Sequence, residues 1–515
     1  MVLVLATAEL SAQQTTGSIH GTVKDPDGNN FGSVNVQIKN SNTGTTYGTV
    51  TNKYGWYSVS GLKPGTYEVM FSFIGYETSG VMSVAIKSAQ DYALDFTMTE
   101  SVVELEDIVI SEASYSFSET KTGQTYQVGS STIEKLPSAN RSLLDYARLS
   151  PYSGSGNTMG GRDGRTTSLT IDGAILNNSM GLSSDLAGAG TPISVDAVEE
   201  MQIAIAPYDV RQSDFTGGGI NVITKSGSNR FQASVYDYFH NQNMRGNKVD
   251  GNSLGERQKQ SLNTTGFTVG GPVVKNRLFY FANAEMTTSP GPVSEWKLSA
   301  DGVGNSKEMT SRVTQADMDA FKSALGQYGY DPGSTDLTDG GQTVYRLLSR
   351  IDFNISERHN LMLRYNWTGS TEAYAPNARS TVGSKMTSER VSQNAYAFSN
   401  NCYDIHDNAW SGALELNSLF GNRGSISNKL LATVSKVSNE RSSSSSWFPH
   451  IDIMKDGDAF MSAGYELFSN GTGNRVYTYS VSDHLSWSAG HSNFMLGAAY
   501  QYQQAKTSYT MYGTG

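Results

Sequence analysis

The chain has 515 residues, which is too long for one ordinary hydrophobic core and predicts two or three domains. Its 53 Gly and 28 Tyr, with only 12 Pro and 17% charged residues, favour a β-rich chain with many turns over a helical protein. A net charge of −10 without a basic stripe excludes nucleic acid as a partner, and one cysteine, Cys402, with seven scattered histidines offers neither a disulfide nor zinc-ligand spacing.

Residues 1–13 resemble the end of a secretory signal peptide, because an apolar stretch is followed by small residues. The basic start of such a signal is missing, so we expect a truncated signal peptide with cleavage near Ala12. No later stretch approaches the roughly 20 apolar residues of a membrane helix. If this chain spans a membrane, it must therefore cross it with strands.

Residues 17–99 alternate short strand signals with turns, among them 25–28, 52–55 and 63–65. This spacing predicts a small β-sandwich. Segments 21–25, 51–57 and 61–67 resemble the carboxypeptidase regulatory-like domain, a module with a carbohydrate-binding-like fold. The resemblance implies an accessory domain in the periplasm without peptidase chemistry, and it leaves sugar binding open at the level of the fold alone.

Residues 101–125 are expected to form a linker. A short β-branched run flanked by acidic residues lies within it, namely Glu106, Asp107, Ile108, Val109 and Ile110. A strand-prone segment in a flexible linker is suited to pairing its backbone with the sheet edge of a partner. The same run could instead be the last strand of the preceding sandwich.

Residues 126–229 begin with a capped helical turn at 131–137 and a short helix at 140–149. Glycine-rich motifs follow, and their most specific members are Gly161, Arg162, Arg165, Asp172, Gly173, Gly217, Gly218 and Gly219. Neither glycine run ends in the Gly-Lys-Ser/Thr of a phosphate-binding loop. We therefore interpret these glycines as tight turns and close backbone contacts beside strands.

In this order, the motifs resemble the plug domain of TonB-dependent outer-membrane transporters, and segments 206–212 and 215–217 narrow the resemblance to the Oar-like, OmpA-related branch. The resemblance implies that Asp172 closes the turn after an inner strand and that residues 217–225 lead the plug into a barrel. It also makes 106–110 the expected TonB box. Segment 199–203 departs from the pattern of many siderophore transporters, so siderophore uptake is not implied.

From residue 231 onward, strands of about ten residues alternate in polarity, as membrane-spanning strands do. In one hairpin Leu347, Ile351 and Phe353 would face lipid, while Arg350, Asp352 and, on the following strand, Arg364 point inward. Short turns alternate with long polar connections, and the connection 288–343 is expected to contain a helix at 314–326. We expect nine strands, and because bacterial barrels have even strand numbers, this part would be an incomplete barrel.

The predicted fold class is therefore mostly β: a small N-terminal β-sandwich (17–99), an α+β plug domain (126–229) and an incomplete antiparallel transmembrane β-barrel (230–515). The predicted function is energy-coupled import of an unidentified ligand across the outer membrane. The resemblance implies TonB as the periplasmic partner, the lipid bilayer as surroundings and room for a surface lipoprotein partner of the kind paired with the related SusC group.

We expect neither enzymatic activity nor a cofactor, because no nucleophile, base and orienting group are brought together by sequence signals. Two alternatives stay open. A surface adhesin or structural protein would not depend on 106–110, whereas a transporter would. A periplasmic carbohydrate-binding protein would rest on residues 17–99 alone.

Overall fold

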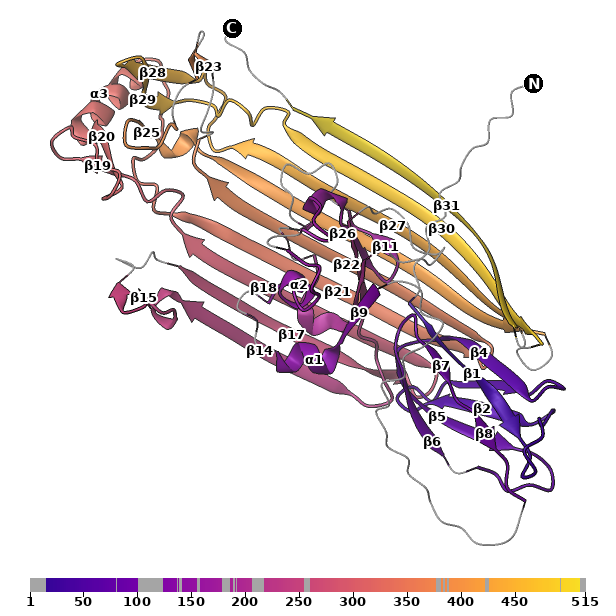
Figure 1. Ribbon diagram of the computed structural model, residues 1–515. Helices are drawn as coiled ribbons and strands as arrows, with labels where there is room; N and C mark the ends of the chain where they lie inside the picture. Colours follow the sequence, from indigo (N-terminus) through magenta and orange to yellow (C-terminus); the bar gives the residue numbers. More distant parts are fainter. Residues whose placement is uncertain are drawn as a thin grey trace, which may run out of the picture.

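The computed structural model describes residues 15–79, 81–100, 124–136, 138, 141–154, 158–177, 186–188, 190, 192–205, 217–253, 260–376, 381–382, 385–386, 389–421, 426–490 and 492–509. Most of these residues lie in strands. The expected signal peptide (1–13) and the expected TonB box (106–110) fall outside the described residues. Figure 1 shows three parts: a small sandwich, a central domain and a large curved sheet.

The N-terminal part is a two-layer sandwich. One sheet has the order β4-β1-β7, with β8 also paired to β1, and the other has the order β3-β2-β5-β6. Their bounds are β1 Gly17–Lys24, β2 Asn35–Asn40, β3 Thr46–Val50, β4 Trp56–Leu62, β5 Gly65–Ser72, β6 Met82–Ile86, β7 Asp91–Ala93 and β8 Phe96–Thr97. Alternate residues of each strand point inward, so Ile19, Ile38 and Phe71 become fully buried between the layers. The sandwich predicted from the turn spacing is confirmed.

The central domain is a five-stranded sheet in the order β11-β10-β13-β12-β9, with two short helices. Its elements are β9 Gln124–Gly129, α1 Ser130–Lys135, α2 Leu143–Ala147, η1 Gly164–Thr166, β10 Ser168–Ile171, β11 Ala174–Ile175, η2 Val195–Ala197, β12 Val198–Ile205 and β13 Gly219–Thr224. The side chain of Ser142 accepts a hydrogen bond at the start of α2, as a helix cap does. The helical turn and short helix are thus confirmed. The linker boundary was wrong by two residues, because Gln124 and Thr125 pair with β12.

The large sheet has nine antiparallel strands that pair in chain order: β14 Gln232–Asn241, β17 Ser261–Val274, β18 Leu278–Gly291, β21 Gly340–Ser356, β22 His359–Tyr374, β26 Tyr403–Phe420, β27 Ile426–Ser443, β30 Gly473–Ala489 and β31 Ser492–Ser508. Short turns join strands at one end, and long connections join them at the other. We call these the short-turn end and the long-loop end. The expected strand number and the alternation of connections are both confirmed, and the sandwich lies at the short-turn end (Figure 1).

The two faces of this sheet differ in chemistry. Leu347 and Ile351 are each 43% exposed on the outer face, while Arg350 and Asp352 are buried on the inner face. This is the arrangement predicted for a strand between lipid and a polar interior. Charged residues are not confined to the inner face, because Asp237 and Asp483 lie on the outer face, where Thr265 and Asn428 each donate a 2.6 Å hydrogen bond to them.

At the long-loop end, three connections fold together into what we call the loop layer, residues 292–339, 389–402 and 444–472. A hydrophobic cluster that includes Met318, Phe321, Phe398 and Phe460 holds them together. The expected helix is present as α3, Gln315–Gly326, and Thr314 caps it with a reciprocal bond to Asp317. The shared core was not expected, because the sequences of these connections are polar and have no periodic apolar pattern.

The short elements of the long connections complete the fold: β15 Lys248–Val249, β16 Asn252–Ser253, β19 Lys297–Ser299, β20 Thr310–Thr314, β23 Thr381–Val382, β24 Lys385–Met386, β25 Tyr396–Ala397, β28 Ile451–Lys455, β29 Asp458–Ala463, η3 Gln242–Met244 and η4 Ser399–Asn401. None of the helices in the described ranges is long and apolar enough to cross a membrane.

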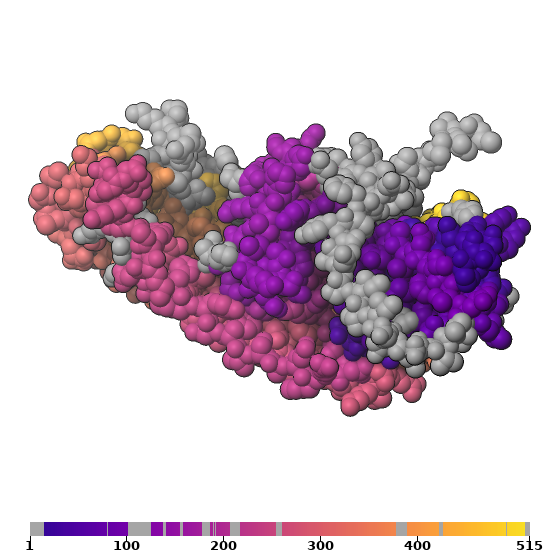
Figure 2. Space-filling view, turned by 60° about the horizontal axis from the view of Figure 1, so that its bottom comes forward, coloured from indigo at the N-terminus to yellow at the C-terminus, as the bar shows by residue number. Residues whose placement is uncertain are grey.

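The central domain stands against the concave, inner face of the large sheet (Figures 1 and 2). Figure 2 shows it as a ridge beside the sandwich. Four inner-face residues, Phe281, Leu348, Ala409 and Val437, join the hydrophobic cluster of the central domain. Other contacts across this boundary are polar, and they form the site described next.

Candidate functional site

The site is built on a two-residue turn of the central domain, Asp172-Gly173, which connects β10 to β11. Both residues have a positive φ, 45° and 81°, as a tight hairpin turn requires. The Asp172 carboxylate is first fixed within its own domain, because it accepts hydrogen bonds from the Thr224 amide at 3.0 Å and the Thr224 hydroxyl at 2.7 Å. The turn therefore presents an oriented carboxylate to the inner face of the large sheet.

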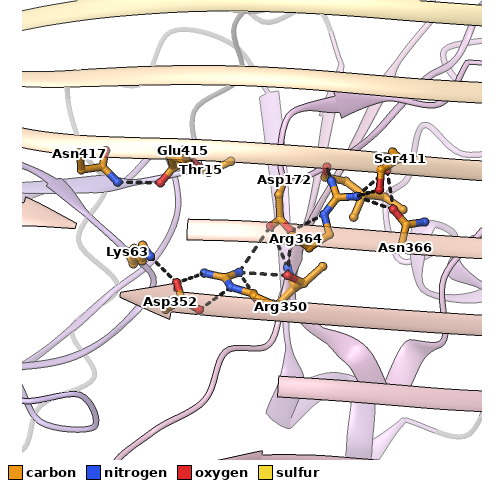
Figure 3. A network of polar contacts seen from close by, with 12 residues as sticks. Thr15, Lys63, Asp172, Arg350, Asp352, Arg364, Asn366, Ser411, Glu415 and Asn417 are labelled. Atoms are coloured by element: carbon orange, nitrogen blue, oxygen red, sulfur yellow. Dashed lines mark hydrogen bonds and ion pairs between the residues drawn. The ribbon is translucent and has the colours of Figure 1, made fainter. Parts of the chain in front are cut away.

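Two arginines of the large sheet receive this carboxylate. Arg350 and Arg364 lie directly opposite each other on β21 and β22, and both are buried. Asp172 lies between them, with Arg364 Nε at 3.2 Å and Arg350 Nη1 at 3.7 Å (Figure 3). Two like charges opposite each other destabilise a sheet, so the carboxylate of the central domain offsets a repulsion within the wall.

Each arginine also has further partners. Arg364 donates to the Ile171 carbonyl, to Asn366 and to Ser411. Arg350 donates to both oxygens of Asp352, at 2.8 and 3.0 Å, and to the Thr224 carbonyl at 2.9 Å. Such bidentate geometry is the strongest form of an arginine–carboxylate contact. The central domain is thus tied to the sheet by charged hydrogen bonds whose donors are all buried.

The sandwich joins the same network. Lys63 Nζ lies 2.6 Å from Asp352, which already holds Arg350 (Figure 3). Nearby, Thr15 donates a 3.1 Å hydrogen bond to Glu415, which also pairs with Lys429 at 3.0 Å. Three parts of the chain therefore meet at one polar cluster near the short-turn end.

The sandwich also contacts the central domain directly. Ser88 donates its hydroxyl and its amide to the carboxylate of Glu200 on β12. Glu200 is only 4% exposed, and burial raises the pKa of its carboxyl group. A second tie between the central domain and the large sheet lies farther along β18, where Ser194 donates to Glu285 at 2.6 Å and Arg346 pairs with Glu285 at 2.7 Å.

Cavities flank these contacts. One of about 710 Å³ lies between the three parts, and its lining includes Lys63, Glu199 and Arg350. Another of about 860 Å³ lies between α1 and the inner face of β14 and β17, and its lining includes Arg141, Asp196 and Tyr238. Both have polar side chains in their walls and enough room for water. Water can therefore reach much of the boundary around the central domain.

The structure divides the predicted motif residues into two groups. Asp172 and Gly173 reach the large sheet, as described. Arg162, Gly217 and Gly218 gather at the opposite end of β10, where a Cβ at Gly218 would lie 2.8 Å from Met159 and Ile205. Gly161 and Arg165 are exposed at this end, and Gly219 begins β13 opposite Ser168. Close packing therefore applies to Gly217 and Gly218, whereas Gly161 has a φ of 74° and a Cβ there would meet nothing within 4 Å.

Sequence reasoning missed the partners of Asp172. It placed Arg350, Asp352 and Arg364 on the inner face but gave no role to them, and it assigned Lys63 only to a turn and Glu415 to no site. A charge on the inner face of a membrane strand was the available signal. It could not identify the partner, because that partner lies 192 residues away in the case of Arg364.

Within the described ranges, no group of three or more His, Cys, Asp or Glu side chains is placed to hold a metal ion. Cys402 is 4% exposed in the cluster of the loop layer, and burial raises the pKa of its thiol to about 12. A thiol with such a pKa is a poor nucleophile at neutral pH.

The loop layer holds one buried charge cluster. Arg390 Nη2 lies 2.8 Å from Asp452, which also accepts hydrogen bonds from His450 and from Ser462 at 2.7 Å. Burial by itself would raise the pKa of Asp452, but the hydrogen bonds from His450 and Arg390 outweigh burial and hold this pKa well below its usual range. The cluster links two of the three connections.

We expect this cluster to make the loop layer sensitive to acid. Because the pKa of Asp452 is lowered in the folded state, its stabilising effect is complete above the unfolded value of about 4 and is lost as the pH falls below it. Amide hydrogen exchange in β28 and β29, measured from pH 7 downward and corrected for intrinsic rates, should show loss of protection there. In Asp452→Asn the protection at pH 7 should be lower and its pH dependence flatter. An unchanged profile would contradict this role.

Comparison with known proteins places these features in a family. The family model of the carboxypeptidase regulatory-like domain matches residues 18–99, and that of the outer membrane beta barrel domain matches 223–298 and 307–515. The resemblance of the sandwich to the former module is thereby confirmed. The latter match covers more than half of the chain and indicates an outer-membrane location.

Two curated relatives carry TonB dependence in their names. The TonB-dependent transporter Oar of Myxococcus xanthus is 24% identical over 339 residues, which are 62% of this chain and 30% of that protein. The TonB-dependent receptor P39 of Formosa agariphila is 26% identical over 290 residues, 53% of this chain and 26% of that protein. The match therefore spans less than a third of either relative.

Two solved structures are similar to this chain at low sequence identity. The outer membrane transporter YddB of Escherichia coli has a TM-score of 0.48 and 14% identity, over 74% of this chain and 48% of that one. The siderophore receptor PirA of Acinetobacter baumannii has a TM-score of 0.47 and 15% identity, over 75% and 48%.

Proposed function

We propose that this chain, which belongs to the outer membrane beta barrel domain family, acts in TonB-dependent import of a ligand across the outer membrane. In this proposal residues 126–229 are the plug, the large sheet is part of the surrounding wall, and the sandwich lies in the periplasm. The two relatives are described as a transporter and a receptor. We therefore propose no covalent chemistry on the ligand.

The observation that carries the proposal is the polar attachment of the central domain. Asp172, Ser194 and Thr224 bind the wall through hydrogen bonds, and cavities on both sides admit water. Water can replace hydrogen bonds of this kind when the domain moves, whereas exposing an equally large apolar interface would cost about 25 cal/mol per Å². A polar interface of this kind suits a domain that must be held in place and still be displaced.

The topology supports a specific order of events under a pulling force. β9 is one of the two edge strands of the central sheet, and it follows the expected TonB box at 106–110 in the chain. A force on that segment loads β9 before any other strand. An edge strand has only one neighbour, here β12, so its separation breaks one ladder of hydrogen bonds. We propose that pulling on 106–110, powered by the inner-membrane proton gradient, displaces the plug through β9.

The sandwich contacts both the wall and the central domain, so these contacts must also change when the plug moves. Lys63 binds the wall at Asp352, and Ser88 binds the central domain at Glu200. Both contacts lie at the short-turn end, through which the ligand would leave. We propose that the sandwich shifts together with the plug during import.

The proposal can be tested by deleting 106–110 from the full chain and measuring binding of a purified periplasmic domain of TonB to the detergent-solubilised protein. We expect the full chain to bind and the deletion to abolish binding, because backbone pairing needs the strand itself. A deletion of equal length at 112–116 is the matched control and should bind as the full chain does. Failure of the full chain to bind TonB would overturn the proposal and favour the adhesin alternative.

A further inference from the structure

The outer face of the large sheet can be followed row by row, because directly opposed residues of antiparallel strands share a face. One row across five strands contains Leu363, Leu414, Ala432, Val481 and Tyr500. The next row toward the long-loop end contains Tyr365, Gly412, Val434, Tyr479 and Tyr502. Both rows are uncharged and suit contact with lipid.

The next two rows toward the long-loop end contain charged side chains. The first contains Trp367, Trp410, Lys436, Tyr477 and Gln504, and the second contains Gly369, Asn408, Ser438, Arg475 and Lys506. Three cations therefore stand on the outer face within two successive rows, on the adjacent strands β27, β30 and β31. We call Lys436, Arg475 and Lys506 the rim patch. Arg475 and Lys506 lie one row above the aromatic rings, and Lys436 lies in the same row as Trp410 and Tyr477.

The distance of the rim patch from the short-turn end, measured along the barrel axis, places it at a membrane boundary. At the short-turn end the outer face carries a second group of aromatic rings, Phe420, Trp487 and Phe494. Tyr477 and Trp487 lie ten residues apart on β30, which is about 33 Å along the strand at roughly 3.3 Å per residue. With a strand tilt of about 40° this separation becomes about 25 Å in height, the apolar band of an outer-membrane barrel.

The charges of the rim patch are poorly compensated. Arg475 and Lys506 are direct cross-strand partners, an arrangement that destabilises a sheet unless an anion lies nearby. Glu440 pairs with Arg475 at 2.6 and 2.8 Å. In the part of the chain that the structure describes, neither Lys436 nor Lys506 forms an ion pair, and Lys436 instead lies 5.9 Å from the Tyr477 ring. This excess of positive charge occurs on a chain whose net charge is −10.

We propose that the rim patch binds the phosphate groups of a phosphorylated glycolipid in the outer leaflet. The guanidinium of Arg475 can donate two parallel N–H groups to one phosphate, while the ammonium groups of Lys436 and Lys506 approach as point charges. Trp410 and Tyr477 flank Lys436 in the row below Arg475 and Lys506, at the level where the amphipathic rings of membrane proteins meet lipid headgroups. The site lies on the outer face of the wall, away from the central domain. Lipid binding there therefore does not depend on import of a ligand.

The test uses the full chain in dodecyl maltoside micelles with bisphosphorylated lipid A as the probe. Binding is measured from intrinsic tryptophan fluorescence and, independently, from the lipid phosphate that co-purifies. Lipid A without its phosphates and phosphatidylglycerol are the comparison lipids. We expect the bisphosphorylated lipid to bind at least tenfold more tightly than either. Equal binding of dephosphorylated lipid A or of phosphatidylglycerol would overturn the proposal.

Two variants separate the site from general effects of charge. K436Q/R475Q/K506Q should weaken binding roughly a hundredfold, because each cation near an anionic membrane surface contributes about fivefold. The control K24Q/K39Q/K87Q removes the same charge from exposed lysines of the sandwich and should leave binding unchanged. Equal losses in both triple variants would contradict a local site.

A third variant tests whether Glu440 competes with the lipid phosphate for Arg475. E440Q removes the carboxylate that occupies Arg475, so it should tighten binding of the phosphorylated lipid several-fold. If Glu440 and Arg475 only stabilise the rim of the sheet, E440Q should weaken binding or leave it unchanged. Either of those results would overturn the proposed role of Arg475.

Discussion

Replacing Asp172 with alanine should loosen the central domain more than any surface substitution in it. The change leaves Arg350 and Arg364 buried opposite each other without the carboxylate between them. Removing one partner of a buried pair costs about 3–5 kcal/mol. We therefore expect amide hydrogen exchange in β10 and β13 to accelerate by roughly two to four orders of magnitude. Mass spectrometry of the detergent-solubilised full chain measures this exchange.

Two further variants serve as controls for this prediction. Asp172→Asn keeps an oxygen that can accept from Thr224 but loses the charge, so its exchange should be intermediate. Glu134→Ala removes an exposed carboxylate of the same domain, which lies 3.5 Å from Lys225. An exposed ion pair contributes at most about 1 kcal/mol. Similar exchange in Asp172→Ala and Glu134→Ala would show that the network does not hold the domain.

Replacing Phe321 with alanine should unfold the loop layer while the large sheet stays intact. Phe321 lies on α3, is 7% exposed and packs in the cluster that joins three connections of the chain. A buried phenylalanine replaced by alanine costs about 3–5 kcal/mol, which is large for so small a core. We expect rapid hydrogen exchange in α3, β28 and β29 and unchanged protection in β21 and β22.

Tyr328→Ala is the matched control for Phe321→Ala. Tyr328 follows the same helix closely in the chain, but it is 80% exposed. A surface substitution of this kind changes stability by about 0.5 kcal/mol or less. If the two variants exchanged alike, the loop layer would not depend on its hydrophobic cluster.

Local patterns in the sequence were sufficient to predict most of the large sheet. Leu347, Ile351 and Phe353 alternate with Arg350 and Asp352, and a period of two assigns these sets to opposite faces in any strand. The helix at 315–326 was equally predictable, because Thr314 and Asp317 form a capping box that acts within four residues. Such signals act over a few residues, so a single sequence contains them in full.

The network around Asp172 could not be predicted in this way. The sequence showed a carboxylate in a turn and arginines on an inner face, but the contact between Lys63 and Asp352 spans 289 residues. No local period connects residues so far apart. The core of the loop layer was missed for a related reason: Phe321, Phe398 and Phe460 come from three separate connections, each of which looks polar when read alone.

The sequence by itself determined the strands, their faces, the turns and the family resemblance, because these depend on neighbouring residues and on backbone geometry. Tertiary structure alone decided which charges meet, where the sandwich binds and that the long connections share a core. Pairing a charge or burying a ring lowers the free energy only when distant segments converge. That convergence depends on how all three parts of the chain fold together.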